Sequence, residues 1–177
     1  MHLREKSEYR SSVRRAFCLA ALVAGATAVA VSAASHVKVA SGVFGGVPWT
    51  LLAQDNKSGS YCITLRLGGT PTSTCNRLNL SGAGGVSYFG HLGRPGPDYW
   101  VGPITSEATR VAITYPDGRR FTVRTISAPP GLAANMSFFV YLTPCRTSRP
   151  KRIAGLDAAG RVVASVNIDR GRSPLAC

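Results

Sequence analysis

Cysteine offers the most chemistry of any side chain in this sequence, and its positions favour disulfide bonds. Cys18 lies close to the N-terminus, and Cys62, Cys75, Cys145 and Cys177 follow it. An even number of cysteines in an exported domain predicts two bridges, and four cysteines allow three pairings. A turn-rich segment separates Cys62 from Cys75, so these two can meet across neighbouring strands. That pairing leaves Cys145 with Cys177, the last residue.

A catalytic thiol is the alternative chemistry for the same residues. Residues 72–75 resemble the strand-end cysteine of sortase-type transpeptidases, whose thiolate needs a His and an Arg beside it. His36 or His91, together with Arg77, would have to supply those partners. An envelope enzyme that used Cys75 or Cys62 with His91 therefore predicts at least one free, reactive thiol in the exported protein.

Other catalytic patterns are absent from the sequence. It contains no Gly-x-Ser-x-Gly nucleophile turn, no His-Glu-x-x-His or Cys-x-x-Cys zinc pattern, and no Gly-rich phosphate loop followed by Lys. A glycosidase needs two carboxyl groups that face one cleft, and Asp98 with Glu107 is the one pair to nominate. The sequence therefore assigns no catalytic residue, no metal site and no cofactor.

Two groups of side chains suit binding, and the first is basic. Residues 145–152 carry Arg146, Arg149, Lys151 and Arg152 without an acidic residue. A loop of this composition offers several hydrogen-bond donors to phosphates or carboxylates, so these four side chains are a candidate anion site. The alternative is a solvated charged loop without a ligand.

The second group is aromatic. Tyr99 and Trp100 lie in a segment rich in Gly and Pro, residues 90–103, close to His91 and Arg94. Exposed rings there would offer their faces to sugars or to partner side chains, which makes Tyr99 and Trp100 candidate ligand contacts. The alternative is that Trp100 fills the core beneath a loop.

The excess of positive charge belongs to the body of the chain. The sequence has 21 Lys and Arg against 8 Asp and Glu, and residues 1–34 hold five and two of these, which leaves 16 against 6. Such a surface attracts nucleic acid, anionic lipid or phosphate-bearing wall polymers. Arg110, Arg119, Arg120 and Arg124 fall on one predicted hairpin and would form a basic stripe. A GC-rich genome, which favours Arg over Lys, is the alternative explanation.

Residues 1–34 have the layout of an export signal. A polar, basic stretch of residues 1–15 precedes residues 16–34, which carry no charge and end in small side chains. This predicted helix is either a cleaved signal peptide or a retained membrane anchor, since nineteen such residues nearly span a bilayer. Both interpretations place residues 35–177 outside the cytoplasm as a single domain, secreted or tethered at its N-terminus.

Short apolar runs separated by turn residues predict an all-β fold. We expect strands over residues 37–43, 48–54, 60–67, 86–89, 109–115, 120–127, 136–143, 151–156 and 161–169. Residues 68–85 are expected to be irregular and residues 90–103 a loop, with at most a few extended residues near Trp100. Because no amphipathic helix of useful length occurs, the domain is expected to be an antiparallel β-sandwich or barrel.

Residues 152–166 resemble strand pairs of immunoglobulin-like domains in exported bacterial proteins. The layout of residues 47–168 is similar to small actinobacterial exported proteins of unknown function, with a Trp-Thr-Leu strand, a close Cys pair, an Asp-Gly hairpin, a Phe-Phe-Val strand and an Asp-x-x-Gly hairpin. This resemblance implies an immunoglobulin-like β-sandwich and no particular reaction. The close spacing of Cys62 and Cys75 departs from antibody domains, which bridge their two sheets around a core Trp.

These observations favour a non-enzymatic module with a binding or structural role at the cell surface. Its expected partner is an anionic cell-wall polymer or another envelope protein. A thiol-dependent envelope enzyme is one alternative, and a membrane-tethered sensor domain, which requires that residues 16–34 are retained, is another. Export and the lack of a recognition helix argue against nucleic acid.

Overall fold

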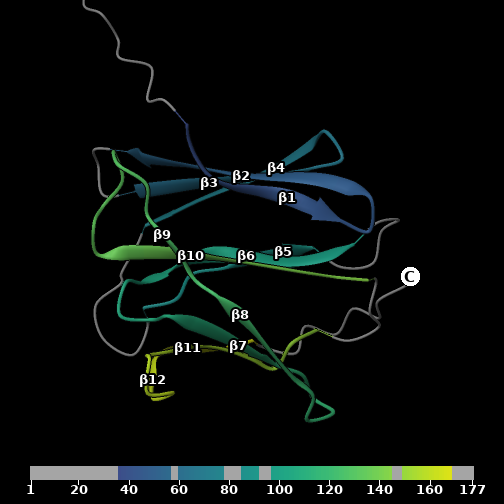
Figure 1. Ribbon diagram of the computed structural model, residues 1–177, viewed down its shortest axis with the longest axis vertical. Helices are drawn as coiled ribbons and strands as arrows, with labels where there is room; N and C mark the ends of the chain where they lie inside the picture. The colour runs from purple at the N-terminus through teal and green to yellow at the C-terminus, as the bar shows by residue number, and fades with distance from the viewer. Residues whose placement is uncertain (1–35, 57–59, 78–84, 92–96, 145–148, 169–177) are drawn as a thin grey trace, which may run out of the picture. The chain divides into compact units, whose positions relative to one another are not determined.

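The computed structural model describes residues 36–56, 60–77, 85–91, 97–144 and 149–168, and all regular structure within these ranges is β-strand (Figure 1). The twelve strands are β1 (Val37–Phe44), β2 (Val47–Asn56), β3 (Ser60–Leu67), β4 (Thr70–Arg77), β5 (Phe89–His91), β6 (Asp98–Thr105), β7 (Arg110–Thr114), β8 (Arg120–Arg124), β9 (Ile126–Ser127), β10 (Met136–Thr143), β11 (Arg152–Leu156) and β12 (Val162–Asn167). The predicted signal or anchor segment lies outside the described residues.

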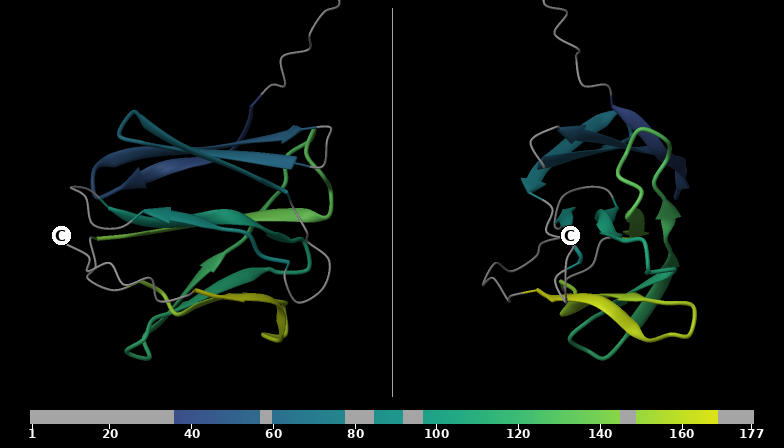
Figure 2. Two further views of the ribbon diagram at one scale, coloured as in Figure 1. Left: turned by 180° about the vertical axis from the view of Figure 1, so that it is seen from behind. Right: turned by 90° about the vertical axis from the view of Figure 1, so that its left-hand side faces the viewer.

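Antiparallel pairing joins these strands into three four-stranded sheets. The N-terminal sheet has the order β1-β2-β3-β4, the middle sheet β5-β6-β10-β9, and the C-terminal sheet β12-β11-β7-β8. The middle sheet lies between the other two in every view (Figures 1 and 2). The all-β, antiparallel prediction is therefore confirmed, although the sheets form three layers where a simple sandwich has two.

Two tight turns fix the register of the N-terminal sheet. Gly45 and Gly46 connect β1 to β2 with φ of 56° and 81°, and Gly68 and Gly69 connect β3 to β4 with φ of 57° and 89°. Positive φ at both central residues is the type I′ geometry, which matches the twist of the flanking strands and favours glycine. The second turn sets Leu67 opposite Thr70, and the same register brings residues 62 and 75 face to face.

The middle sheet is apolar on both faces because each face covers a core. In β6 every residue from Asp98 to Ile104 is buried. Phe138 and Phe139 are neighbours on β10, and alternation along the strand sends their rings to opposite sides, where both are 0% exposed. The expectation that residues 136–143 form a central strand is confirmed.

The first core lies between the N-terminal and middle sheets. Leu51, Ile63 and Leu65 come from β2 and β3, and they pack in one cluster with Val101 and Phe138 of the middle sheet. The Tyr61 ring adds an aromatic contact, with its centroid 5.7 Å from that of Phe138. Full burial of each such side chain contributes roughly 1.5–3 kcal/mol of transfer free energy.

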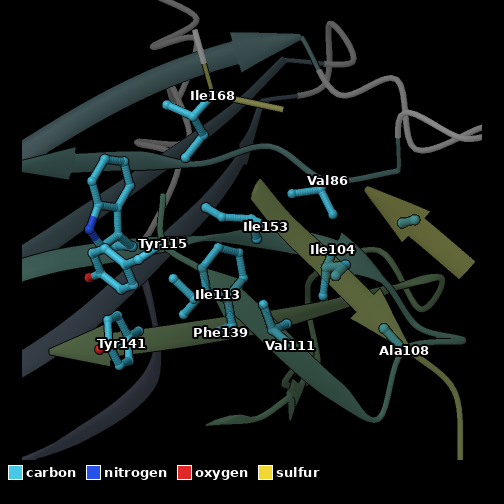
Figure 3. Packing of buried hydrophobic residues seen from close by; sticks show 12 residues of the cluster. Val86, Ile104, Ala108, Val111, Ile113, Tyr115, Phe139, Tyr141, Ile153 and Ile168 are labelled. Atoms are coloured by element: carbon cyan, nitrogen blue, oxygen red, sulfur yellow. The ribbon is translucent and has the colours of Figure 1, made fainter. Parts of the chain in front are cut away.

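The second core lies between the middle and C-terminal sheets. Phe139 of β10 lies among Val111, Ile113 and Ile153 of the C-terminal sheet (Figure 3). The two sheets approach closely at Gly155, where an added Cβ would come within 2.5 Å of Ile104 Cδ1. The opposite face of the C-terminal sheet carries the exposed Arg110, Arg120 and Arg124, together with Ala112 and Ala154, which are buried.

Two sequence predictions are wrong. Residues 90–103 were expected to form a loop, and yet β6 over Asp98–Thr105 is the most deeply buried strand of the middle sheet. Residues 68–85 were expected to be irregular, and yet Thr70–Arg77 pair along their whole length with β3. Strand β4 was not predicted, because its mostly exposed Thr, Ser and Asn side chains show no alternation of apolar and polar residues.

Candidate anion-binding face

The cysteine prediction is confirmed for one bridge. Cys62 on β3 and Cys75 on β4 are register partners, and their sulfur atoms form a disulfide with Cα atoms 4.1 Å apart. Beside it, Thr64 Oγ1 and Ser73 Oγ are 2.8 Å apart across the same strand pair. With its sulfur in the bridge, neither Cys62 nor Cys75 presents a thiolate as a nucleophile.

Several other predicted positions lie outside the described residues. These are Cys145, Cys177 and Arg146, together with the side chain of His91. In the described part of the chain, no helix is long and apolar enough to cross a membrane. No group of three His, Cys, Asp or Glu side chains there is placed to hold a metal ion.

The two predicted aromatic contacts are core residues. Tyr99 and Trp100 are each 4% exposed, because they belong to β6 and not to a loop. Tyr99 packs in the first core and Trp100 in the second. Neither ring therefore presents a face to a ligand. The nominated carboxyl pair also fails to converge, since Asp98 begins β6 and Glu107 lies beyond its far end.

The β7–β8 hairpin turn neutralises one arginine of the predicted stripe. Asp117 accepts a hydrogen bond from the Arg119 amide at 3.0 Å, and a second from Arg119 Nε at 2.6 Å. These bonds and the adjacent guanidinium lower the pKa of the Asp117 carboxyl below its usual value. Arg119 is therefore a turn residue whose charge is matched by its own neighbour.

The β11–β12 turn repeats this arrangement. Asp157 accepts a hydrogen bond from the Arg161 amide at 2.8 Å and another from Arg161 Nε at 2.7 Å, and the pKa of its carboxyl is lowered for the same reasons. The two turns lie at opposite ends of the C-terminal sheet (Figure 2). Two of the carboxylates of the described chain are thus each engaged by one arginine at a hairpin tip.

Between these turns, the outer face of the C-terminal sheet carries arginines. Val111 and Ile113 point into the second core, so alternation places Arg110, Ala112 and Thr114 on the opposite side. The outward-facing residues of β7, β8, β11 and β12 are called the basic face below. They lie in three rows across the strands, because the registers of the sheet align them.

The first row begins with two arginines. Arg124 on β8 and Arg110 on β7 are register partners, and both are exposed. Leu156 on β11 continues the row as the next partner of Arg110. Side chains directly opposite in an antiparallel pair have Cβ atoms about 5 Å apart. The Arg110 guanidinium extends toward the β11–β12 turn, where an added Cβ at Gly160 would lie 3.9 Å from its Nη2.

The third row places an arginine on each side of a threonine. Thr114 on β7 is the register partner of Arg120 on β8 and of Arg152 on β11. The two arginines are therefore two strand spacings apart, about 10 Å, with a hydroxyl between them. Of the predicted loop residues that the structure describes, Arg152 joins the basic face. Arg149 is half-buried, and Lys151 is exposed just before β11.

The residues of the middle row have small, uncharged side chains. It consists of Thr122, Ala112, Ala154 and Ser165 on the four successive strands. Ser165 holds the nearest arginine, since Arg152 Nη2 lies 3.1 Å from its Oγ. This contact positions one guanidinium over the small residues before any ligand arrives.

Within the described ranges, no carboxylate forms an ion pair with Arg110, Arg120, Arg124 or Arg152. Among the described residues, the ion pairs formed by arginine with aspartate join Arg119 to Asp117 and Arg161 to Asp157. None involves Arg110, Arg120 or Arg124. An anion at this face would meet several guanidinium donors, of which Arg152 is already oriented by its contact with Ser165.

The sequence identified part of this site. The stripe on the predicted hairpin contains Arg110, Arg120 and Arg124, which do share the basic face, whereas Arg119 does not. Arg152 was predicted as an anion-binding residue of the loop over residues 145–152, and its place beside the hairpin arginines was not predicted. Its alternation with the buried Ile153 is a signal that places it on the outer side of a strand.

Comparison with known proteins adds no relative from which a role could be transferred. No protein-family model matches the chain, and neither does any curated protein sequence or any solved structure.

Proposed function

We propose that this protein is an exported, non-enzymatic β-sandwich module that binds an anionic polymer of the cell envelope through its basic face. The observation that carries the proposal is the presence of Arg110, Arg120, Arg124 and Arg152 on one side of the C-terminal sheet, with no carboxylate partner among the described residues. The formal net charge of +13 adds a long-range attraction for polyanions.

We also infer that the middle and C-terminal sheets form an immunoglobulin-like unit. If β5 to β12 are lettered A, B, C, C′, D, E, F and G, the sheet orders become A-B-E-D and G-F-C-C′. This is the strand order of immunoglobulin sandwiches. The chain also passes from one sheet to the other between β8 and β9 at Thr125, as the C′-to-D connection requires. The N-terminal sheet is then an added layer on the A-B-E-D face.

The proposal of export is supported by the disulfide as well as by the predicted export signal of residues 1–34. The Cys62–Cys75 disulfide is of the kind that forms and persists in oxidising compartments. A domain that works outside the cytoplasm meets the phosphate- and carboxylate-bearing polymers of the envelope at high local concentration. An oxidising compartment and nearby anionic polymers both suit a basic β-domain that contains a disulfide.

Retention on isolated, protein-stripped cell walls at rising salt tests this function. We expect retention to fall steeply with salt, because bound counterions are released when arginines meet the polymer. Arg110→Gln with Arg124→Gln should lower the slope of log affinity against log salt by about two. The control, Arg119→Gln with Arg161→Gln, removes the same charge from the hairpin tips and should leave most of the binding.

Three results would overturn the function. The wild-type protein would not be retained on stripped walls, or its retention would not depend on salt, or the control pair would weaken it as much as the pair on the basic face. The last result would mean that diffuse charge, rather than this face, holds the polymer. Retention that requires wall proteins would point instead to a protein partner.

A further inference from the structure

Strand β4 leaves one edge of the N-terminal sheet open. Among the described strands it pairs with β3 and no other, and this pairing runs from Thr70 to Arg77 without a register shift. Every residue of the strand except Thr74 is exposed, so both of its faces are largely open to solvent. An open edge of this length is a template for a further strand.

The other sheet edges that the structure describes are protected in ways that β4 is not. β1 carries Lys38 beside a register shift, and β8 carries Arg120 and Arg124. β12 is joined to β11 through a register shift, and β5 and β9 are only three and two residues long. Charge, irregularity and short length all hinder pairing at an edge. In β4 the corresponding features lie near its two ends, at Pro71 and Arg77.

The backbone groups of every second residue in β4 point away from β3. Facing residues that exchange no backbone hydrogen bonds have Cα atoms about 4.5 Å apart, against about 5.5 Å for a hydrogen-bonded pair. The Cα atoms of Cys62 and Cys75 are 4.1 Å apart, so theirs is a non-hydrogen-bonded pair. The amide and carbonyl of Cys75 therefore face the open edge, and alternation adds those of Ser73 and Arg77. Pro71 adds a carbonyl without an amide.

We propose that β4 pairs with β4 of a second copy of this chain, antiparallel about a two-fold axis beside Thr74, and so joins two N-terminal sheets into one continuous sheet. This register sets residues 71–77 of one copy opposite residues 77–71 of the other. The inference concerns a different surface from the basic face and does not depend on the proposed function.

The backbone of β4 is complementary to itself in this register. Ser73 of each copy lies opposite Cys75 of the other, and the two residues exchange both hydrogen bonds. Each Arg77 amide donates to the Pro71 carbonyl of the other copy, so the missing proline amides fall at the ends of the pairing. About six hydrogen bonds between the copies result. Each arginine faces a proline and not a second arginine, which avoids repulsion between like charges.

The side chains of β4 also match in this register. Thr74 is the register partner of the buried Ile63, which places it and Thr72 on the core-facing side of the sheet. Thr74 then lies opposite Thr74 of the other copy, and Thr72 lies opposite Asn76. Cross-strand pairs of threonine are favourable, because their hydroxyls bond each other. One strand pair buries less surface than a standard interface of about 1,600 Å², so we expect a weak, reversible dimer.

Disulfide trapping tests the register directly. In Thr74→Cys the two new sulfur atoms face each other across the two-fold axis, within reach of a bridge. In Thr72→Cys, the matched control on the same side of the same strand, the two new side chains lie about 13 Å apart along the strand direction. We expect Thr74→Cys to yield a reducible dimer on oxidation and Thr72→Cys to yield roughly a tenth as much or less. Peptide mapping should find the Cys62–Cys75 bridge intact in both variants.

Sedimentation equilibrium of the oxidised, exported protein measures the dimer without a crosslink. Ser73→Pro removes from each copy an amide that faces the open edge, and it should weaken dimerisation at least about tenfold. Ser41→Pro is the matched control, since Ser41 is an exposed serine of β1 at the opposite edge of the same sheet. Alternation from the Gly45–Gly46 turn directs its amide away from β2, so this control should leave the dimer unchanged. Unaltered circular dichroism confirms that both variants have folded.

Three results would overturn the dimer. The protein would sediment as a monomer up to about 1 mM, or Ser41→Pro would weaken association as much as Ser73→Pro, or Thr72→Cys would crosslink as readily as Thr74→Cys. Salt separates this association from polymer binding. Because two basic copies repel each other at low ionic strength, added salt should favour the dimer and should weaken retention on cell walls. A monomer that is still retained on walls would leave the proposed function standing.

Discussion

Arg110 on β7 and Arg124 on β8 are directly opposite each other in an antiparallel strand pair, on the solvent side of the sheet. A carboxylate at either position would complete a favourable cross-strand pair. Elsewhere the chain pairs arginine with aspartate within its hairpin turns. Asp117 holds Arg119, and Asp157 holds Arg161, at the two hairpin tips. On the face between the tips, Arg110, Arg120 and Arg124 have no carboxylate partner within the part of the chain that the structure describes, which suits a surface that binds anions.

Arg124→Glu should stabilise the free protein and weaken polymer binding. The new carboxylate would lie opposite Arg110 and replace a repulsive pair with an attractive one, worth about 0.2–1 kcal/mol in the free energy of unfolding. Urea denaturation measures this gain, and wall retention measures the loss of binding. Arg119→Glu makes the same change in charge at a hairpin tip, and it should be destabilising because it breaks the contact with Asp117. A less stable Arg124→Glu variant would show that the two guanidinium groups do not repel each other.

Loss of the disulfide should loosen β4 in particular. Every residue of the strand but Thr74 is exposed, and among the described strands it pairs with β3 and no other. Cys62→Ala with Cys75→Ala therefore removes its covalent attachment to the sheet. The bridge spans a sequence separation of 13, and its removal should cost about 3 kcal/mol in the free energy of unfolding. Amide hydrogen exchange should accelerate in β4 before it does in β10. The control, Thr64→Ala, breaks a hydrogen bond in the same strand pair and should cost only about 1 kcal/mol. Equal losses in the two variants would contradict this assignment.

Gly102→Ala should destabilise the middle sheet far more than an alanine at a turn. An added Cβ at Gly102 would lie 1.9 Å from the Ser87 carbonyl oxygen, a backbone atom that is held because the Ser87 amide donates to the Pro103 carbonyl. The segment before β5 would have to move, at a cost of about 3 kcal/mol. Gly69→Ala meets no atom within 4 Å and should cost about 1 kcal/mol for its φ of 89°. Thermal denaturation of both variants compares the two costs, and similar melting temperatures would argue against the close approach.

Acid should weaken the hairpin tips slightly. Hydrogen bonds from Arg119 and Arg161 lower the pKa values of Asp117 and Asp157 in the folded protein. Their contribution to stability is therefore present above the ordinary carboxyl pKa, and it is lost as pH falls through the lowered folded-state values. Because both carboxyls are at the surface, solvent screens the effect and the change should be small. Melting temperatures of Asp117→Asn with Asp157→Asn should depend less on pH in the acid range than those of the wild type. An identical acid dependence would show that other groups control it.

The strands that bury one clear row of apolar side chains could be predicted from the sequence. The hairpin around Asp117 and Gly118, the double-faced strand β10 and the pairing of Cys62 with Cys75 all follow from local patterns. Strand β6 could not be predicted in this way, because its Gly102 and Pro103 are typical of loops. Gly102 serves a close approach by Ser87, a contact from a neighbouring segment that the local pattern does not contain.

The candidate site was predicted only in part for a similar reason. Arginine side chains on one hairpin could be grouped from sequence, since Arg120 and Arg124 lie on the same side of β8. The place of Arg152 beside Thr114 depends on the pairing of β11 with β7, whose residues are about forty positions apart in the chain. Such long-range registers are set by the packing of whole sheets and carry no local signature.

The most direct test of the basic face is a backbone amide NMR titration of the exported domain with long poly(glycerol phosphate). We expect the largest chemical-shift changes in β7, β8 and β11, around Arg110, Arg124 and Thr114, with β1 to β4 unaffected. Changes confined to the N-terminal sheet, or none at polymer concentrations that saturate wall binding, would contradict the assignment of anion binding to this face.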